Sequence, residues 1–256
     1  MREVATTHNT STGAPIDWPT SNRTGRRGVW LAENARAGDQ DVNFGTKSMG
    51  AHMLSSEAVI VPWGLMQDEQ YNLIGYINDE LVERIGRSSN EAMTTGDGVG
   101  KPTGIVNGAT LGVTGVSVDG ITSDELIDME HSVNSAYRKG AGWMFSDASL
   151  KVVKKLKDGD GRPLWRPGVT GSDPDDILGY GYTINDDMAD MATGEKSVLF
   201  GDLSRYLIRQ VMDVGLYRLT GDEHTRHAQT GFLAWTRLDG KLMDVSGESV
   251  KFFQNA

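Results

Sequence analysis

The chain has 256 residues, of which 38% are hydrophobic and 23% are charged, a balance that suits a folded protein with one or two cores. It has no cysteine, which excludes disulfides and thiolate metal sites, and no apolar run approaches the length of about 20 residues that a membrane helix needs. A formal net charge of −10 argues against a dedicated nucleic-acid binder, because such proteins usually present a basic face.

The first 61 residues predict two extended segments. Residues 1–28 mix Thr, Ser, Asn, Pro and Gly with isolated apolar residues, which indicates an extended arm outside the core and no signal peptide. Residues 29–61 predict a β-hairpin with a first strand at 29–33, a polar tip at 34–44 and a return at 45–61. On the return, Met49, Ala51 and Met53 alternate with polar residues, and residues 58–61 are expected to be buried on both faces.

Such a hairpin needs a surface to lie on, because two strands alone are marginally stable in water. The pattern by itself favours the edge of a sheet in the same chain.

Residues 65–93 predict one long amphipathic helix. Its apolar face repeats every three or four residues. A rise of about 1.5 Å per residue gives a rod of roughly 40 Å, much longer than the mean helix of about three turns. We therefore expect this helix to be the spine of the fold, with a buried face formed by Ile74, Ile77, Leu81 and Ile85.

A glycine-rich turn is predicted directly after the helix, since glycine adopts left-handed conformations and ends helices easily. A phosphate-binding loop is the alternative, but it would need glycine where Thr95 stands, a hydroxyl residue where Pro102 follows Lys101, and a strand before it. We therefore interpret the segment as a structural turn without a cofactor. Its residues are Gly96, Asp97, Gly98, Gly100, Pro102 and Gly104.

The rest of the chain alternates helices and short strands. Thr122 and Glu125 form a capping box for a helix that ends near Gly140, and Ser146 caps a second helix that ends near Gly159. Residues 143–145 predict a buried strand between these helices, and residues 158–176 are rich in Gly and Pro. Strands are expected at 198–202, 206–209, 216–219, 232–238 and 250–253, with a polar loop at 220–231 and a chain reversal at 239–240.

Candidate catalytic and metal residues are few. His224 and His227 lie beside Asp222 and Glu223, which permits a metal-dependent enzyme, but no second cluster follows and a solvated loop is the simpler interpretation. Acidic runs at 173–176 and 186–187 lack the alternating spacing of a calcium loop. Without cysteine or a Gly-x-Ser-x-Gly motif, no catalytic triad is predicted. The expected protein is therefore not an enzyme and has no catalytic, cofactor or metal residues.

The order of these elements resembles the major capsid proteins of tailed bacteriophages, whose HK97-like fold is named after phage Hong Kong 97. The resemblance covers nearly the whole chain. The residues that carry it are the spine helix with 68–69 and 90–91, the turn at 95–105, the strings at 156–158 and 161–165, the Gly-Tyr strand at 179–182, and Phe-Gly-Asp at 200–202.

The resemblance implies an α+β fold in five regions. They are an N-terminal extended arm at 1–28, an E-loop hairpin at 29–61, a P-domain with the spine helix at 62–112, an A-domain at 113–196, and a return to the P-domain sheet at 197–256. In the family, the segment that corresponds to the start of this sequence follows upstream residues that are often removed on maturation. Residues before Met1 are therefore expected.

The resemblance also implies a function. Copies would assemble as hexamers and pentamers into an icosahedral virion shell around double-stranded DNA, without sequence-specific binding, in the host bacterial cytoplasm. Portal, scaffold or protease, and decoration proteins would be partners, and no membrane is involved. An encapsulin-type nanocompartment or a gene-transfer-agent capsid is the alternative with the same fold.

In the family the E-loop reaches a neighbouring subunit. The corresponding residues here are Arg36, Asp39, Asp41, Lys47, Met49 and Met53. Some members join the E-loop lysine to an asparagine of another subunit. Lys47 is the only lysine of this hairpin, but Gln229 aligns near the asparagine position, which speaks against a cross-link.

Overall fold

The computed structural model describes residues 1–21, 27–39, 45–68, 72–157, 176–244 and 246–256. The chain forms two compact units. Unit 1 comprises residues 1–15, 49–108 and 206–242, and unit 2 comprises residues 16–48, 109–205 and 243–256. None of the helices within the described ranges is both long enough and apolar enough to cross a membrane.

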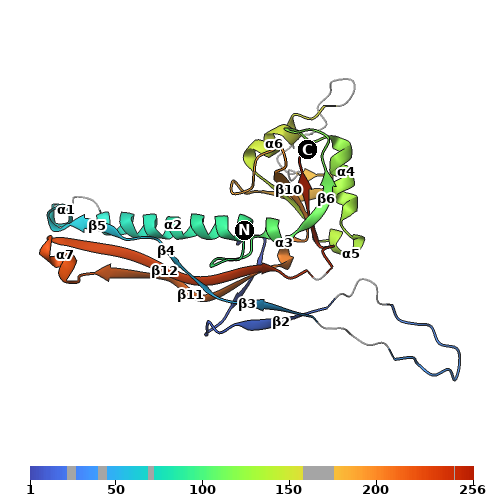
Figure 1. The fold of residues 1–256 in the computed structure, drawn as a ribbon, viewed down its shortest axis with the longest axis horizontal. Helices are drawn as coiled ribbons and strands as arrows, with labels where there is room; N and C mark the ends of the chain where they lie inside the picture. The colour runs from blue at the N-terminus through green and yellow to red at the C-terminus, as the bar shows by residue number, and fades with distance from the viewer. Residues whose placement is uncertain (22–26, 40–44, 69–71, 158–175, 245) are drawn as a thin grey trace. The chain divides into compact units, whose positions relative to one another are not determined.

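Unit 1 is a five-stranded sheet with helix α2 along one face (Figure 1). Strands β11 and β12 are its long central pair, and the N-terminal β1 lies parallel to β11 at one edge. Strands β4 and β5 both pair with β12 at the other edge. The strands are β1 (Thr6–Asn9), β4 (His52–Ser55), β5 (Val59–Pro62), β11 (Tyr206–Leu219) and β12 (Gln229–Leu242).

The predicted spine helix is present, but it begins later than expected. Helix α2 is Leu73–Thr95, capped by Asn72, whose side chain accepts a hydrogen bond from Gly75 N at 3.1 Å. Residues 63–67 form a separate helix, α1 (Trp63–Gln67), so the predicted start at residue 65 is wrong. An N-cap leaves the preceding backbone non-helical, which explains the separation.

The buried face of α2 contains three of the four predicted residues. Ile77, Leu81 and Ile85 pack in one cluster with residues of β5 and β12. The assignment of Ile74 to this face is wrong, because Ile74 lies in the first turn and is 38% exposed while its neighbour Leu73 packs against the cluster. Leu81, at 0% exposure, lies at the centre of the face.

The predicted hairpin pairs differently from expectation. Strand β3 (Gly45–Met49) pairs with β2 (Ile16–Thr20), not with residues 29–33, which form no strand and expose Trp30 completely. The prediction that residues 1–28 stay outside the core is therefore also wrong, because β1 joins the sheet of unit 1 and Met1 is buried. Pairing partners far apart in sequence depend on the whole fold, and strand propensity does not identify them.

Strands β4 and β5 form one interrupted edge of the unit 1 sheet, so the sheet edge within the chain is the correct alternative for this part of the hairpin. At the interruption, Ser56 N donates to Ala234 O at 3.0 Å, and Ala234 N donates to Ser56 Oγ at 2.9 Å. The prediction that residues 58–61 are buried on both faces is wrong: Val61 is buried but Ile60 is 50% exposed.

Strands β11 and β12 are longer than predicted. β11 runs without a break from residue 206 to 219, and β12 continues through Asp239 and Gly240, where a chain reversal was expected. Gly240 has another purpose, because a Cβ there would overlap the Tyr206 hydroxyl. The expected polar loop before β12 contains helix α7 (Asp222–Arg226).

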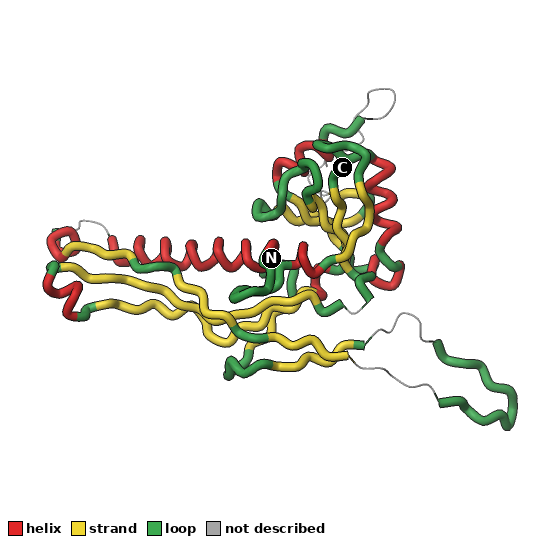
Figure 2. The backbone as a smooth tube through the Cα atoms, viewed as in Figure 1, coloured by secondary structure: helices red, strands yellow, loops and turns green. Residues whose placement is uncertain are grey.

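Unit 2 contains a six-stranded sheet with helices packed on it (Figure 2). Its strand order is β6-β13-β10-β7-β9-β8. The strands are β6 (Thr110–Thr114), β7 (Gly142–Phe145), β8 (Asp176–Ile177), β9 (Tyr180–Ile184), β10 (Lys196–Gly201) and β13 (Val250–Gln254). The expectation that residues 197–256 return to a single sheet with the spine helix is wrong, since β10 and β13 lie here and only β11 and β12 lie in unit 1.

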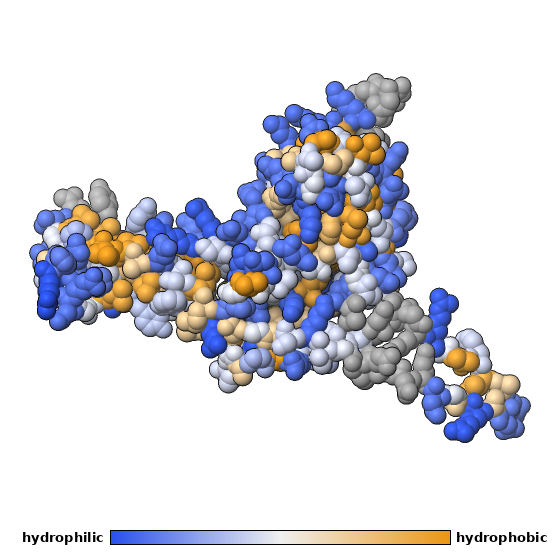
Figure 3. All heavy atoms as spheres, viewed as in Figure 1, coloured by the Kyte–Doolittle hydropathy of each residue, from blue (hydrophilic) through white to orange (hydrophobic). Residues whose placement is uncertain are grey.

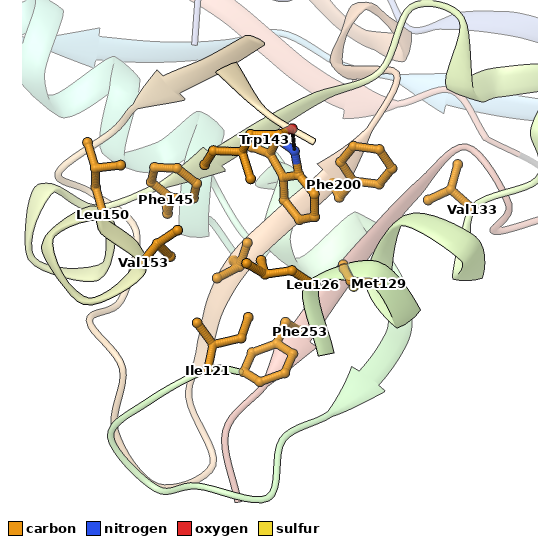
Figure 4. Packing of buried hydrophobic residues seen from close by; sticks show 12 residues of the cluster. Ile121, Leu126, Met129, Val133, Trp143, Phe145, Leu150, Val153, Phe200 and Phe253 are labelled. Carbon is orange, nitrogen blue, oxygen red and sulfur yellow. Dashed lines mark hydrogen bonds between the residues drawn. The ribbon is translucent and has the colours of Figure 1, made fainter. Parts of the chain in front are cut away.

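The core of unit 2 combines aromatic and aliphatic side chains (Figure 4). Trp143, Phe145, Phe200 and Phe253 are all fully buried, and Trp143 Nε1 donates to Ile177 O at 3.0 Å. This confirms the predicted buried strand at 143–145. Phe253, on β13, explains why the C-terminal strand belongs to this unit.

The helices of unit 2 are α4 (Ser123–Ser132), α5 (Ser135–Arg138) and α6 (Asp147–Lys154). Both predicted N-caps are confirmed: Thr122 and Glu125 form a capping box, and Ser146 Oγ accepts from Ser149 N at 3.2 Å. The first helix stops earlier than predicted because Asn134 caps a separate short helix. Two further short helices are α3 (Ile105–Gly108) in unit 1 and the 3₁₀ turn at Leu203–Arg205 in unit 2.

Candidate assembly elements

The glycine turn closes the end of the spine helix. Gly96 is the C-cap, with φ −56° and ψ 145°. It is therefore needed because it has no side chain, and not for the left-handed conformation that was expected. A Cβ at Gly96 would overlap the carbonyl oxygens of Ala92 and Pro102. Gly104 N then donates to Gly96 O at 2.8 Å, which folds the turn back onto the helix end.

The tip of the turn is exposed and has left-handed backbone. Gly98 has φ +82° and Gly100 has φ +69°. The Asp97 carboxylate accepts from Val99 N at 3.0 Å and lies 3.9 Å from Lys101 Nζ. The bond from Val99, aided by the charge of Lys101, lowers the pKa of Asp97. A carboxylate occupies the centre of this loop, so the loop does not suit a phosphate.

The base of the turn is attached to the sheet of unit 1. The Tyr206 hydroxyl donates to Thr103 O at 2.8 Å, and Thr103 N donates to Gly240 O at 3.1 Å. Burial raises the pKa of Tyr206, and the nearby charge of Asp239 raises it further, so the phenol stays protonated and remains a donor. Sequence reasoning missed Tyr206 because its partner lies far away in the chain.

The predicted hairpin residues do not share one environment. Arg36 and Asp39 are exposed, and Asp41 lies outside the described residues. Lys47 Nζ donates to Asp244 O. Met53 is 56% exposed, but the placement of Met49 on an intersubunit surface is wrong, because Met49 is only 2% exposed within its own chain.

Exposed apolar residues also lie in the segment that the sequence predicted to be the first strand of the hairpin. Val29 is 82% exposed, Trp30 is 100% exposed and Leu31 is 50% exposed. Figure 3 shows apolar side chains at the surface of the loop that joins β2 to β3, mixed with hydrophilic ones. A tryptophan without intramolecular burial is unusual, and buried tryptophans are typical anchors of protein–protein interfaces.

The histidines of the metal hypothesis lie at helix α7. His224 is within the helix and His227 is its C-cap. Within the described residues, no group of three or more histidine or acidic side chains is arranged to hold a metal ion. Of the acidic runs, 173–175 lies outside the described residues, while Asp186 Oδ1 accepts from Asp147 N at 3.4 Å.

A polar depression of about 480 Å³ lies beside the end of α4 in unit 2. Its polar groups serve the local backbone: Arg138 Nε donates to Val133 O at 2.9 Å, and Asn134 Oδ1 accepts from Ala136 N at 3.0 Å. These bonds satisfy backbone groups at helix termini, which is a structural role.

Comparison with known proteins identifies a curated relative of this chain. The major capsid protein of Halomonas phage phiHAP-1 is 24% identical over 210 residues, which are 80% of this chain and 32% of that protein. The chain thus spans 32% of the length of the curated relative that it matches.

Solved structures share the fold. The capsid of a native GTA particle, computed with C5 symmetry, matches with a TM-score of 0.84 and 24% identity, over 100% of this chain and 89% of that chain. A chain of Gordonia phage Cozz matches with a TM-score of 0.76 and 14% identity, over 100% of this chain and 85% of that one. The sequence model of the phage capsid family matches residues 1–254. Because that match includes nearly every residue, this chain belongs to the phage capsid family.

Proposed function

We propose that the chain is the major capsid protein of a tailed-phage-like particle, and that its copies assemble into a closed icosahedral shell around double-stranded DNA. The observation that carries this proposal is the family match over residues 1–254. The GTA capsid structure was computed with C5 symmetry, which supports self-association around a five-fold axis here as well. Pentamers at the vertices and hexamers between them would complete the shell, which places the protein in the virion.

In this proposal unit 1 is the P-domain and the six-stranded sheet of unit 2 with its helices is the A-domain. The E-loop is then the segment from β2 to β3 and not residues 29–61. The support is that β2 and β3 form their own two-stranded sheet, while β4 and β5 belong to the sheet of unit 1. The N-terminal arm is shorter than predicted, because residues 6–9 are a strand of unit 1.

The proposed intersubunit contact is the loop between β2 and β3. Val29, Trp30 and Leu31 supply apolar area, and Arg36 and Asp39 supply charge at its rim. Buried apolar area contributes about 25 cal/mol per Å², so a few hundred Å² at each copy is worth roughly several kcal/mol per contact. Repetition over every subunit would stabilise the shell far more than it stabilises one chain.

A gene-transfer-agent capsid is the second candidate, favoured by the TM-scores of 0.84 and 0.83 for native and empty GTA particles. It has the same fold and would have the same structural role as the wall of a closed particle. Portal, scaffold or protease, and decoration proteins are proposed partners in both cases. Neither case requires a catalytic residue, a cofactor or a metal.

The test is electron microscopy of the purified protein, expressed with any upstream precursor residues, together with extraction of the contents. We expect closed particles of uniform size that hold double-stranded DNA when the packaging components are supplied. A folded protein as the cargo would favour the nanocompartment alternative. A stable monomer or dimer under all conditions, with the full precursor supplied, would overturn the proposal.

A further inference from the structure

One buried arginine in unit 1 contacts two segments that lie far apart in the sequence. The chain leaves unit 1 after residue 15 and returns to it at residue 49, so residues 10–13 and 49–51 are the two roots of the segment 16–48. Arg209, on β11, is only 2% exposed. Its guanidinium donates to Thr12 O at 2.6 Å, Gly50 O at 2.8 Å, Thr10 Oγ1 at 3.1 Å and Met49 O at 3.2 Å.

Asp239 holds the second root from another direction. It is the cross-strand neighbour of Arg209 on β12 and is 6% exposed. Its Oδ2 accepts from Gly50 N at 2.6 Å, so the N–H and the C=O of Gly50 are both bound by buried charged side chains. Strand β3 ends at Met49 and β4 begins at His52, and the two charged groups therefore bind the backbone where strand pairing is interrupted.

Fold stability alone does not explain a buried charge at this position. Removing a guanidinium from water is costly, and apolar residues of similar volume often stabilise a core equally well. Within the described ranges no ion pair joins Arg209 to a carboxylate, and three of its four acceptors are backbone oxygens. A planar guanidinium with five donors can bind two separate segments at once, which an apolar side chain cannot do.

We propose that Arg209 is a positioning residue that fastens both roots of the segment 16–48 to the sheet of unit 1. Asp239 holds the second root as well, through Gly50 N. Fixed roots limit the conformations of the segment before it meets a second copy of this chain, which lowers the entropy cost of that contact. This consequence for assembly rests on the proposed function. The fastening itself does not.

The test compares Arg209→Met with Arg218→Met in the full chain. Arg218 lies on the same strand but is exposed, so it receives the same substitution without touching either root. Hydrogen exchange of the unassembled protein is followed in peptides that cover residues 10–13 and 49–51. We expect exchange on the order of tenfold faster or more at both roots in Arg209→Met, with β11 and β12 still protected, and no change in Arg218→Met.

Unchanged exchange at both roots in a folded Arg209→Met protein would overturn the fastening. If that variant does not fold, Arg209→Lys decides, because lysine keeps the charge but lacks the planar fork of donors that reaches both roots. Faster exchange at both roots supports the fastening, and no change at either root overturns it.

Assembly is then measured separately by counting particles. We expect severalfold fewer shells from Arg209→Met than from Arg218→Met. Equal yields despite faster exchange would overturn the role in assembly. Failure of the unaltered chain to form any shell would count against the proposed function and leave the exchange result standing.

Discussion

At Gly104 the chain folds back against the end of α2, and a Cβ there would overlap the carbonyl oxygen of Thr94. Backbone atoms cannot rotate away, so we expect Gly104→Ala to lower the free energy of unfolding by about 3 kcal/mol, the upper part of the usual range for single substitutions. Gly100→Ala has open space and only the left-handed φ to oppose it, so it is expected to cost about 1–2 kcal/mol.

Denaturant unfolding of the two glycine variants measures both values. Lys101→Ala is the control, because its contact with Asp97 is exposed and weak. A large loss from Lys101→Ala together with a harmless Gly104→Ala would show that the turn binds a ligand and is not a steric device.

Tyr206 makes the stability of the protein depend on alkaline pH. Its pKa is raised by burial and by the charge of Asp239, so the folded chain keeps a proton that the unfolded chain loses above its ordinary pKa of about 10. Its contribution is thus fully present below about pH 10 and is lost as the pH rises further. Tyr206→Phe is expected to flatten this decline, and also to cost about 1 kcal/mol at neutral pH through the lost bond to Thr103.

Thermal unfolding of both proteins between pH 7 and about 11 checks this prediction. The two proteins differ only at residue 206, so only the difference between the two curves is interpreted. Identical slopes above pH 10 would contradict the assignment to Tyr206.

At the scale of the element, helix α2 predicts unequal losses of stability from two apolar residues that lie about two turns apart. Leu81→Ala removes a side chain with 0% exposure and is expected to cost about 2–5 kcal/mol. Ile74→Ala, at 38% exposure, is expected to cost less than about 1 kcal/mol. Equal losses in denaturant unfolding would mean that the first turn of α2 packs more tightly than the structure shows.

The loop between β2 and β3 is expected to matter for the shell and not for the single chain. A Cβ on Gly45 would lie 3.2 Å from Thr20 Oγ1, so the ends of the loop are adjacent and a short glycine linker can replace residues 22–43. Residues 27–39 are exposed, and their loss removes no core. We predict a protein that unfolds cooperatively at nearly the original temperature but no longer closes into shells.

Trp30→Ser is the smaller companion variant, expected to reduce the particle count while leaving the melting temperature unchanged. Calorimetry and microscopy of both variants give the two readouts. Outright unfolding of the deletion would show that the loop belongs to its own core, and normal shells from it would remove the loop from the intersubunit contact.

For the whole molecule, the net charge of −10 predicts weak and unspecific contact with DNA. We expect the unassembled chain to bind duplex DNA only at low salt, with a shallow dependence of the binding constant on salt concentration, because few phosphates are neutralised. Fluorescence titration over a salt series measures that slope. A steep slope or a sequence preference would indicate a basic surface that the net charge conceals.

Much of the candidate assembly apparatus was predictable from local signals. The long helix that ends at Gly96, the capping box at Thr122 and the buried strand around Trp143 were predictable, since periodicity, caps and glycine stops act within a few residues. The start of that helix at Asn72 was not predicted. The order of these elements was also enough to indicate the phage capsid family.

The tertiary structure decided everything that depends on a distant partner. It paired β3 with β2, buried Met49, left Trp30 exposed, and divided the C-terminal strands between the two units. The physical reason is that the sequence of a strand does not specify the strand with which it pairs. Alternation specifies which face of the strand is apolar, and only the packed sheet determines the position of the strand in the sheet and the core against which that face packs. Arg209 shows the same limit, because in the sequence it is one more charge on a strand, and only the fold brings both roots of the segment 16–48 within reach of its guanidinium.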